Sequence, residues 1–201
     1  MLFRSKDADW FHVTGITPGI SESLCELTLE GLTCCRSKGI TVSCDLNYRA
    51  KLWKWGADPA EVMPRITAMT DVLIANEEDC QKCLGLNVDV DVESGEVEAE
   101  NYRPMTDRLF AEYPNLTHLS VSLRESLSAD YNRWSGLLAL RDGFYVSRKY
   151  DIRHIVDRIG GGDSFGSALI HGLRSLNHPS EAVEFAMAAS ALKHTDRKSV
   201  V

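Results

Sequence analysis

Residues 157–166 of the chain read DRIGGGDSFG, and the residues at 168–173 read ALIHGL, which is typical of a helix rich in small residues. A strand-like segment at 152–156 precedes the glycines. Three glycines let backbone amides approach an anion without hindrance from side chains, and the amides at a helix N-terminus favour negative charge. The stretch therefore predicts a strand, a phosphate-binding turn and a helix in succession.

Asp163 follows the three glycines directly, and its carboxylate would repel a phosphate. A carboxylate at this place suits a different task, which is to accept the proton of a hydroxyl that attacks phosphorus. The alternative is that Asp163 caps the helix and that the glycines form a tight turn without a ligand. The residues of the stretch leave both interpretations open.

Outward from this stretch, strand-like apolar runs alternate with amphipathic helical segments, which indicates an α/β fold with a mainly parallel sheet. A turn is expected at 14–19, and a helix starts at Asp58, with Pro59 at its first position and Glu61 completing a capping box. The other expected strands lie at 10–13, 40–44, 72–75, 117–122, 136–140 and 144–147, and the other expected helices at 21–38, 76–85, 163–176 and 180–193.

Composition indicates one globular domain over residues 1–201, with 44% hydrophobic and 25% charged residues. A net charge of −7 argues against nucleic-acid binding, which depends on clustered Lys and Arg. No apolar run approaches the roughly 18 residues of a membrane span, and no signal peptide is recognisable at the first residues. We therefore expect a cytoplasmic protein without a membrane partner, whose six cysteines are free thiols.

Two further motifs follow expected strands. The first, DLNYR at 45–49, ends in Arg49, whose planar side chain suits a carboxylate or phosphate, although an ion pair with Asp45 is an equal alternative. The second, NEED at 76–79, places Glu78 and Asp79 at a helix start, where acidic residues complement the helix dipole.

Two other features suggest metal binding but have plainer explanations. The acidic residues within 86–103 indicate a solvated surface insertion rather than a metal site. Cys80 and Cys83 share a helix face, and no second cysteine pair or nearby histidine pattern completes a zinc site, so buried thiols are the expectation. Metal binding by the cysteines remains a third, less favoured hypothesis.

The glycine stretch resembles the second signature of the PfkB family of ribokinase-like carbohydrate kinases, whose usual form is D-T-x-G-A-G-D. Both aspartates and the first and third glycines match, whereas Arg158 and Gly161 stand where the family usually has Thr and Ala. The DLNYR motif is most similar to that of the 2-keto-3-deoxygluconate kinases in this family. The resemblance extends over about residues 9–195.

This resemblance implies a ribokinase-like three-layer αβα sandwich with a mostly parallel sheet. It also implies ATP and Mg²⁺ as cofactors and a sugar acid as the small-molecule substrate. The site residues it implies are Asp163 as base and substrate contact, Gly160, Gly161 and Gly162 as phosphate site, Ser122 and Arg124 for the nucleotide, Arg49 for the substrate, and Asp79 and Glu78 for outer-sphere metal contact.

Members of that family carry N-terminal strands and a small β lid that have no counterpart in this sequence. The expected sheet therefore has an open edge, which would allow pairing into a homo-oligomer. The leading hypothesis is an enzyme that phosphorylates 2-keto-3-deoxygluconate to its 6-phosphate. The alternative is a non-catalytic nucleotide-binding or interaction module derived from such a kinase.

Overall fold

The computed structural model describes residues 7–86, 99–128 and 130–196. These residues form two compact units. The first unit comprises the described residues up to 86 together with 104–119, and the second comprises residues 99–103 and the described residues from 120 onward.

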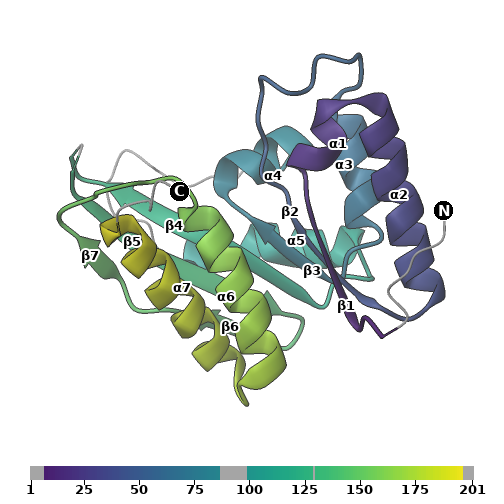
Figure 1. Ribbon diagram of the computed structural model, residues 1–201. Helices are drawn as coiled ribbons and strands as arrows, with labels where there is room; N and C mark the ends of the chain where they lie inside the picture. Colours follow the sequence, from purple (N-terminus) through teal and green to yellow (C-terminus); the bar gives the residue numbers. More distant parts are fainter. Residues whose placement is uncertain (1–6, 87–98, 129, 197–201) are drawn as a thin grey trace. The chain divides into compact units, whose positions relative to one another are not determined.

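The first unit contains three parallel strands in the order β1 (Trp10–Thr14), β2 (Thr41–Asp45) and β3 (Val72–Ala75). Val13 pairs with Cys44, and Cys44 pairs in turn with Leu73. The helices are α1 (Ile16–Ile20), α2 (Glu22–Ser37), α3 (Pro59–Thr67), α4 (Glu77–Leu84) and α5 (Arg103–Glu112), shown in Figure 1. The alternation of strand and helix expected from the sequence is thus confirmed in this unit.

The expected helix starts are confirmed, with one difference in detail. Ser21 caps α2, and Asp58 caps α3 by accepting a hydrogen bond of 2.9 Å from the amide of Ala60. The reciprocal capping box forms at α4 instead, between Asn76 and Asp79. The Asp58 carboxylate binds the amide of Ala60, the second residue of α3, rather than the amide of Glu61, which a capping box would use.

The second unit is built from strands that pair antiparallel and from two long helices. Strand β5 (Asn132–Leu140) pairs antiparallel with both β6 (Gly143–Val146) and β7 (Tyr150–Ile152). Strand β4 (His118–Ser126) enters this unit at residue 120, and a short 3₁₀ helix, η2 (Ala99–Tyr102), belongs to it as well. Helices α6 (Gly161–Ser175) and α7 (Pro179–Thr195) pack against each other (Figure 1). A Cβ on Gly172 would lie 2.8 Å from Cα of Ala182, so glycine permits this close packing.

Several sequence expectations are corrected by the structure. The turn expected at 14–19 is largely helical, because α1 begins at Ile16. Helix α5 was not expected, although its buried residues Met105 and Leu109 have helical spacing. The strand expected at 152–156 is β7, which ends at Ile152. The acidic residues from 87 to 98 lie outside the described residues, so the expected insertion stays a prediction.

The six cysteines are free thiols, as expected. Burial raises the pKa of the Cys83 thiol to about 12 and also raises the pKa of Cys44 and Cys80. Such thiols stay protonated at neutral pH, which opposes metal binding through them. In the part of the chain that the structure describes, none of the helices has the length and apolarity needed to cross a membrane. A cytoplasmic location stays a prediction.

Candidate functional site

The glycine loop lies where the sequence places it, at the start of α6. Gly160 is the residue before the first helical turn, with φ of 82° and ψ of 5°. The carbonyl oxygen of Gly160 accepts a hydrogen bond of 2.9 Å from the amide of Ser164, which closes the first turn. Residues 160–163 therefore form the N-terminus of a helix of 15 residues.

The first amides of α6 are open to a ligand. The amide of Gly161 makes a long contact of 3.4 Å with the carbonyl oxygen of Arg158. The next two amides, of Gly162 and Asp163, have no acceptor among the described residues. Amides at a helix N-terminus that lack an acceptor are a suitable site for phosphate oxygens, because the helix dipole also favours negative charge there.

The three glycines serve different purposes. Gly160 has a positive φ, which disfavours any residue with a side chain. A Cβ on Gly161 would lie 2.5 Å from Cε1 of His194, so this position needs glycine for packing. A Cβ on Gly162 would meet nothing within 4 Å. Local structure therefore explains the first two glycines but not the third, which lies beside open space.

Asp163 is the third residue of α6, and its side chain is exposed. The residue that precedes the helix is Gly160, and no side chain caps this N-terminus. The interpretation of Asp163 as a helix cap is therefore not what the structure shows. Among the described residues, the Asp163 carboxylate has neither a hydrogen-bond partner nor an ion pair. It is available to a ligand.

Three residues of α7 that contact the loop, Ser190, Lys193 and His194, were not predicted from the sequence. The imidazole of His194 is buried against Gly161, and its Nδ1 donates a hydrogen bond of 2.7 Å to the carbonyl oxygen of Ser190. The hydroxyl of Ser190 donates a bond of 2.9 Å to the carbonyl oxygen of Gly161. Lys193 passes over Gly160, since its Cε would lie 3.8 Å from a Cβ built there. A Lys-His pair at a helix end carries no clear sequence signal.

A cavity of about 700 Å³ is lined mainly by residues of α6 and α7. Ser164 and Ser167 contribute polar groups to its wall, Phe185 and Leu192 contribute apolar ones, and Lys193 also lines it. Asp163 is not among its lining residues. The cavity thus starts one residue after the predicted base and includes the lysine that covers the glycine loop.

The predicted nucleotide contacts Ser122 and Arg124 lie on one face of β4, because successive residues of a strand point to opposite faces. Ser122 is half-buried and Arg124 is exposed, whereas the residues that alternate with them, Val121, Leu123 and Glu125, are buried. Neither side chain makes a hydrogen bond with the glycine loop among the described residues. Their role in nucleotide binding stays a prediction.

In the first unit, the DLNYR and NEED motifs follow two neighbouring strands, as expected. Asp45 is the last residue of β2, and Asn76 comes directly after β3. Asn47 adopts a left-handed backbone conformation with φ of 40° and donates a hydrogen bond to Thr14, which turns the chain away from the strand. Arg49 is exposed and donates a bond of 2.7 Å to the carbonyl oxygen of Tyr48. Its guanidinium group faces solvent rather than the core.

Asp79 connects these two motifs. Its Oδ1 accepts a hydrogen bond of 2.8 Å from the amide of Tyr48, and its Oδ2 accepts one of 3.2 Å from the amide of Asn76. The side chain is 3% exposed, and burial raises its pKa, although the two amides and Arg49 act in the opposite direction. Both oxygens of Asp79 are therefore occupied within the protein.

The metal prediction can be tested against this geometry. No group of three or more metal-binding side chains occurs among the residues described. Each carboxylate oxygen of Asp79 accepts a backbone hydrogen bond and the side chain is buried, so direct coordination of Mg²⁺ by this residue does not fit, and we derive no step through the metal. Glu78 is exposed at the same helix start and is the carboxylate that a hydrated cation could approach. The outer-sphere role of Asp79 and Glu78 stays a prediction.

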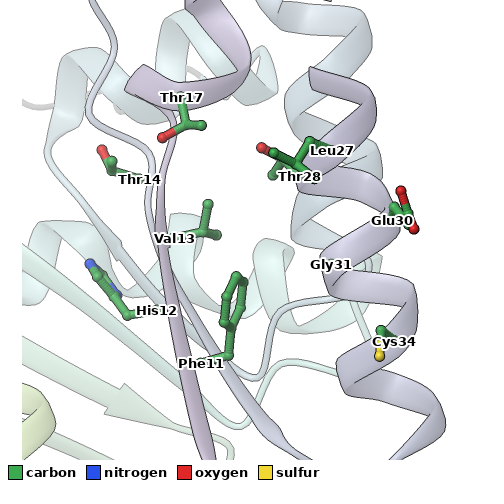
Figure 2. A pocket seen from close by; sticks show the side chains of 10 residues that line it. All are labelled: Phe11, His12, Val13, Thr14, Thr17, Leu27, Thr28, Glu30, Gly31 and Cys34. Atoms are coloured by element: carbon green, nitrogen blue, oxygen red, sulfur yellow. The ribbon is translucent and has the colours of Figure 1, made fainter. Parts of the chain in front are cut away.

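A separate cavity of about 390 Å³ lies in the first unit between β1 and α2. Figure 2 shows Phe11 and Val13 of β1 on the side of Leu27 and Thr28 of α2, while His12 points the other way. None of the residues predicted for the site lines this cavity. Its nearest link to them is Thr14, which lines it and accepts a hydrogen bond from Asn47 of the DLNYR motif. We assign it no role in phosphoryl transfer.

The known proteins to which this chain is similar include several sugar kinases. The structure of 2-dehydro-3-deoxygluconokinase from Thermotoga maritima matches with a TM-score of 0.88 and 41% identity, covering 98% of this chain and 58% of that one. A PfkB family carbohydrate kinase from Listeria grayi matches with a TM-score of 0.81 and 28% identity, covering 96% and 56%. In sequence, 2-dehydro-3-deoxygalactonokinase from Haloferax volcanii is 30% identical over 190 residues, which are 94% of this chain and 52% of that protein.

These similarities confirm the α/β class and the ribokinase-like fold, and they confirm the resemblance to PfkB-type carbohydrate kinases. Among those kinases, the relatives named above include two that act on 2-dehydro-3-deoxy sugar acids. The chain spans just over half the length of these relatives. A search against family models gives no match.

Proposed function

We propose that this chain carries the phosphoryl-transfer machinery of a sugar-acid kinase that moves the γ-phosphoryl group of ATP to the 6-hydroxyl of 2-keto-3-deoxygluconate. The observation that carries the proposal is the start of α6. There the exposed carboxylate of Asp163 has no partner among the described residues, and two amides without an acceptor lie in the same turn. One helix start thus offers both a base and an anion site.

The chemistry follows from these groups. The substrate hydroxyl oxygen attacks the γ-phosphorus, and the bond from that phosphorus to the bridging oxygen of ADP breaks. The hydroxyl proton passes to Asp163, and ADP leaves with the bond electrons. The amides of Gly162 and Asp163 hold oxygens of the transferred group, whose negative charge they stabilise together with the helix dipole. A bound Mg²⁺ would supply further charge neutralisation.

A sugar acid is favoured over a neutral sugar by two independent points. The kinases named for the Thermotoga and Haloferax relatives act on acids of one chemical type, 2-dehydro-3-deoxy sugar acids. Arg49 presents an exposed guanidinium group, which binds carboxylates with two parallel hydrogen bonds. We therefore propose Arg49 as the partner of the substrate carboxylate.

The proposal is tested by incubating the purified 201-residue chain with Mg²⁺, ATP and 2-keto-3-deoxygluconate. The expected products are ADP and a phosphate monoester at the 6-position, which phosphorus NMR distinguishes from inorganic phosphate. The galactonate epimer and gluconate serve as competing acids, and ribose serves as a neutral sugar. Phosphorylation of ribose at the same rate as the acids would contradict the role of Arg49.

The same samples distinguish the kinase from the alternative, a non-catalytic nucleotide-binding module. Calorimetry with ATP alone and with the sugar acid alone measures each affinity without turnover. Binding of both ligands together with transfer supports the kinase. Binding of ATP without sugar binding or transfer would support a nucleotide-binding module instead, and would overturn the proposed activity for this chain.

A further inference from the structure

Lys193 carries a buried charge that has no partner in the described part of the chain. Its Nζ is shielded from solvent and forms no hydrogen bond. The residue lies in the last turn of α7, and its Cε reaches to within 3.8 Å of the Cβ position above Gly160. The ammonium group is therefore held beside the start of α6 rather than extended into solvent.

An arrangement of this kind is costly for the unliganded protein. A buried ammonium group without a hydrogen-bond acceptor loses its hydration and gains nothing in exchange. Buried polar groups in folded proteins almost always find a partner, so an exception calls for a specific explanation. A lysine that served only to cover the loop with its methylene groups would let its charged end reach water.

The Nζ of Lys193 has no hydrogen-bond acceptor among the described residues, whereas amides without an acceptor lie at the start of α6. The amides of Gly162 and Asp163 are without an acceptor, and the N-terminus of α6 carries the positive end of the helix dipole. An ammonium group and the positive end of a dipole repel each other unless an anion lies between them. An anion with several oxygens would satisfy the two amides and Lys193 at once.

The position of Lys193 is fixed by its neighbours on α7. The hydroxyl of Ser190 donates to the carbonyl oxygen of Gly161, and the ring of His194 contacts the same glycine. His194 also lies against the indole ring of Trp134, with ring centroids 4.7 Å apart. The amide of Val156 donates to the carbonyl oxygen of His194 at 2.9 Å. The end of α7 is thus attached to the glycine loop on both sides of Lys193.

We propose that Lys193 is a phosphate-binding residue of the glycine loop, and that its Nζ contacts the phosphate oxygens of the nucleotide together with the amides of Gly162 and Asp163. This inference rests on the proposed function for the identity of the ligand. The position itself requires only a polyphosphate anion.

Two substitutions separate charge from shape. Lys193→Met keeps the length of the side chain and removes the charge, and Lys193→Arg keeps the charge. Calorimetry on the whole chain measures the affinities for ATP, for tripolyphosphate and for adenosine, which lacks phosphates. Loss of one charged contact to phosphate predicts a decrease of at least tenfold in affinity for ATP and tripolyphosphate with Lys193→Met. Lys193→Arg is expected to stay within about fivefold, and adenosine affinity is expected to be unchanged in both variants.

Thermal unfolding of the unliganded variants gives a readout that a structural role would not produce. Since the charge of Lys193 is unpaired, Lys193→Met is expected to raise the melting temperature by about 2–4 °C. A lysine that held the fold together would give a lower melting temperature when replaced. A rise in stability combined with weaker polyphosphate binding is therefore the signature of a binding residue.

The outcomes decide between the two proposals. Unchanged affinity of Lys193→Met for both polyphosphates, or an equal loss for adenosine, overturns the role of Lys193. A charge-dependent loss for tripolyphosphate in a chain that transfers no phosphoryl group from ATP supports Lys193 while overturning the kinase activity. Phosphoryl transfer that proceeds with unchanged ATP affinity in Lys193→Met supports the kinase and overturns Lys193.

Discussion

The backbone amide of Tyr48 donates a hydrogen bond of 2.8 Å to Oδ1 of Asp79. This bond fastens the loop after β2 to the first turn of α4, while the other carboxylate oxygen of Asp79 completes the capping box with Asn76. Asp79 thus fixes the backbone next to Arg49, the residue proposed to meet the substrate. An acidic residue that the sequence suggested as a metal contact has a structural function here.

Asp79→Asn should destabilise the protein, because an amide side chain has one acceptor oxygen where the carboxylate uses two. One buried backbone amide then lacks a partner, which costs about 1–3 kcal/mol. Urea unfolding measures the change in unfolding free energy. Glu61→Gln, an exposed acid in the first turn of α3, is the matched control and should change it by less than about 0.5 kcal/mol.

The pH dependence of the Asp79 contribution has a defined sign. Burial raises the pKa of Asp79 in the folded chain above its ordinary value of 3.8. A raised pKa means that the folded state binds the proton more tightly than the unfolded chain does. The stability that Asp79 contributes is therefore fully present below the unfolded pKa and is lost as pH rises through the folded pKa. The difference in unfolding free energy between the wild type and Asp79→Asn should therefore shrink as pH rises above the ordinary value of 3.8. A difference that grows with pH would contradict this assignment.

The three glycines of the loop should respond differently to alanine. Gly161→Ala places a methyl group against His194 and should cost about 1–3 kcal/mol of stability. Gly160→Ala should cost roughly 1–2 kcal/mol because of its positive φ. Gly162→Ala meets open space within a helix and should leave stability unchanged or raise it by up to about 1 kcal/mol.

Only Gly162→Ala separates folding from binding, so it is the variant to test with ligand. If phosphate oxygens occupy the open space above the amides of Gly162 and Asp163, the added methyl group displaces them. We expect ATP affinity to fall at least tenfold in a variant that unfolds like the wild type, with calorimetry as the measurement. Wild-type affinity in Gly162→Ala would place the phosphates elsewhere.

An element of the fold could be predicted from the sequence where it depends on neighbouring residues alone. The cap at Asp58, the strand at 72–75 and the helix after the glycines were predicted, because each rests on neighbouring residues alone. Helix α5 was missed, because the acidic residues before it indicate a surface segment up to residue 103, where the helix begins. The end of β7 was misplaced, because its antiparallel pairing with β5 ends at Ile152.

In the candidate site too, features set by neighbouring residues could be predicted, and features set by contacts between distant residues could not. The glycine loop and Asp163 form a contiguous motif, so their positions were predictable. Lys193 and His194 meet the loop only because α7 packs along α6, a contact between residues some thirty positions apart in sequence that no spacing rule reveals. The bond from Tyr48 to Asp79 is of the same kind, because it depends on the pairing of β2 with β3.

Cysteine reactivity offers a test of the packing of the first unit. Cys34 is half-buried and lines the cavity between β1 and α2, whereas the other five cysteines are buried. Iodoacetamide at pH 8 should therefore label Cys34 first in the native chain, with mass spectrometry locating the adduct. Cys80 and Cys83 should react only on unfolding, because burial raises the pKa of both thiols. Early labelling of either would show that α4 opens in the native state.

The proposed base gives the sharpest prediction on activity. Asp163→Asn removes the proton acceptor but keeps the size and exposure of the side chain, and no hydrogen bond to another described side chain is lost. The rate of phosphoryl transfer should fall about 10²–10⁴-fold, which is the usual contribution of a positioned base. Removing a negative charge near the phosphates should leave ATP affinity unchanged or slightly higher. Asp142→Asn, an exposed acid in the turn between β5 and β6, is the matched control and should keep the wild-type rate. Because catalysis by positioning survives the loss of a base, complete retention of the rate in Asp163→Asn would remove Asp163 from this role while leaving the phosphate site of the glycine loop intact.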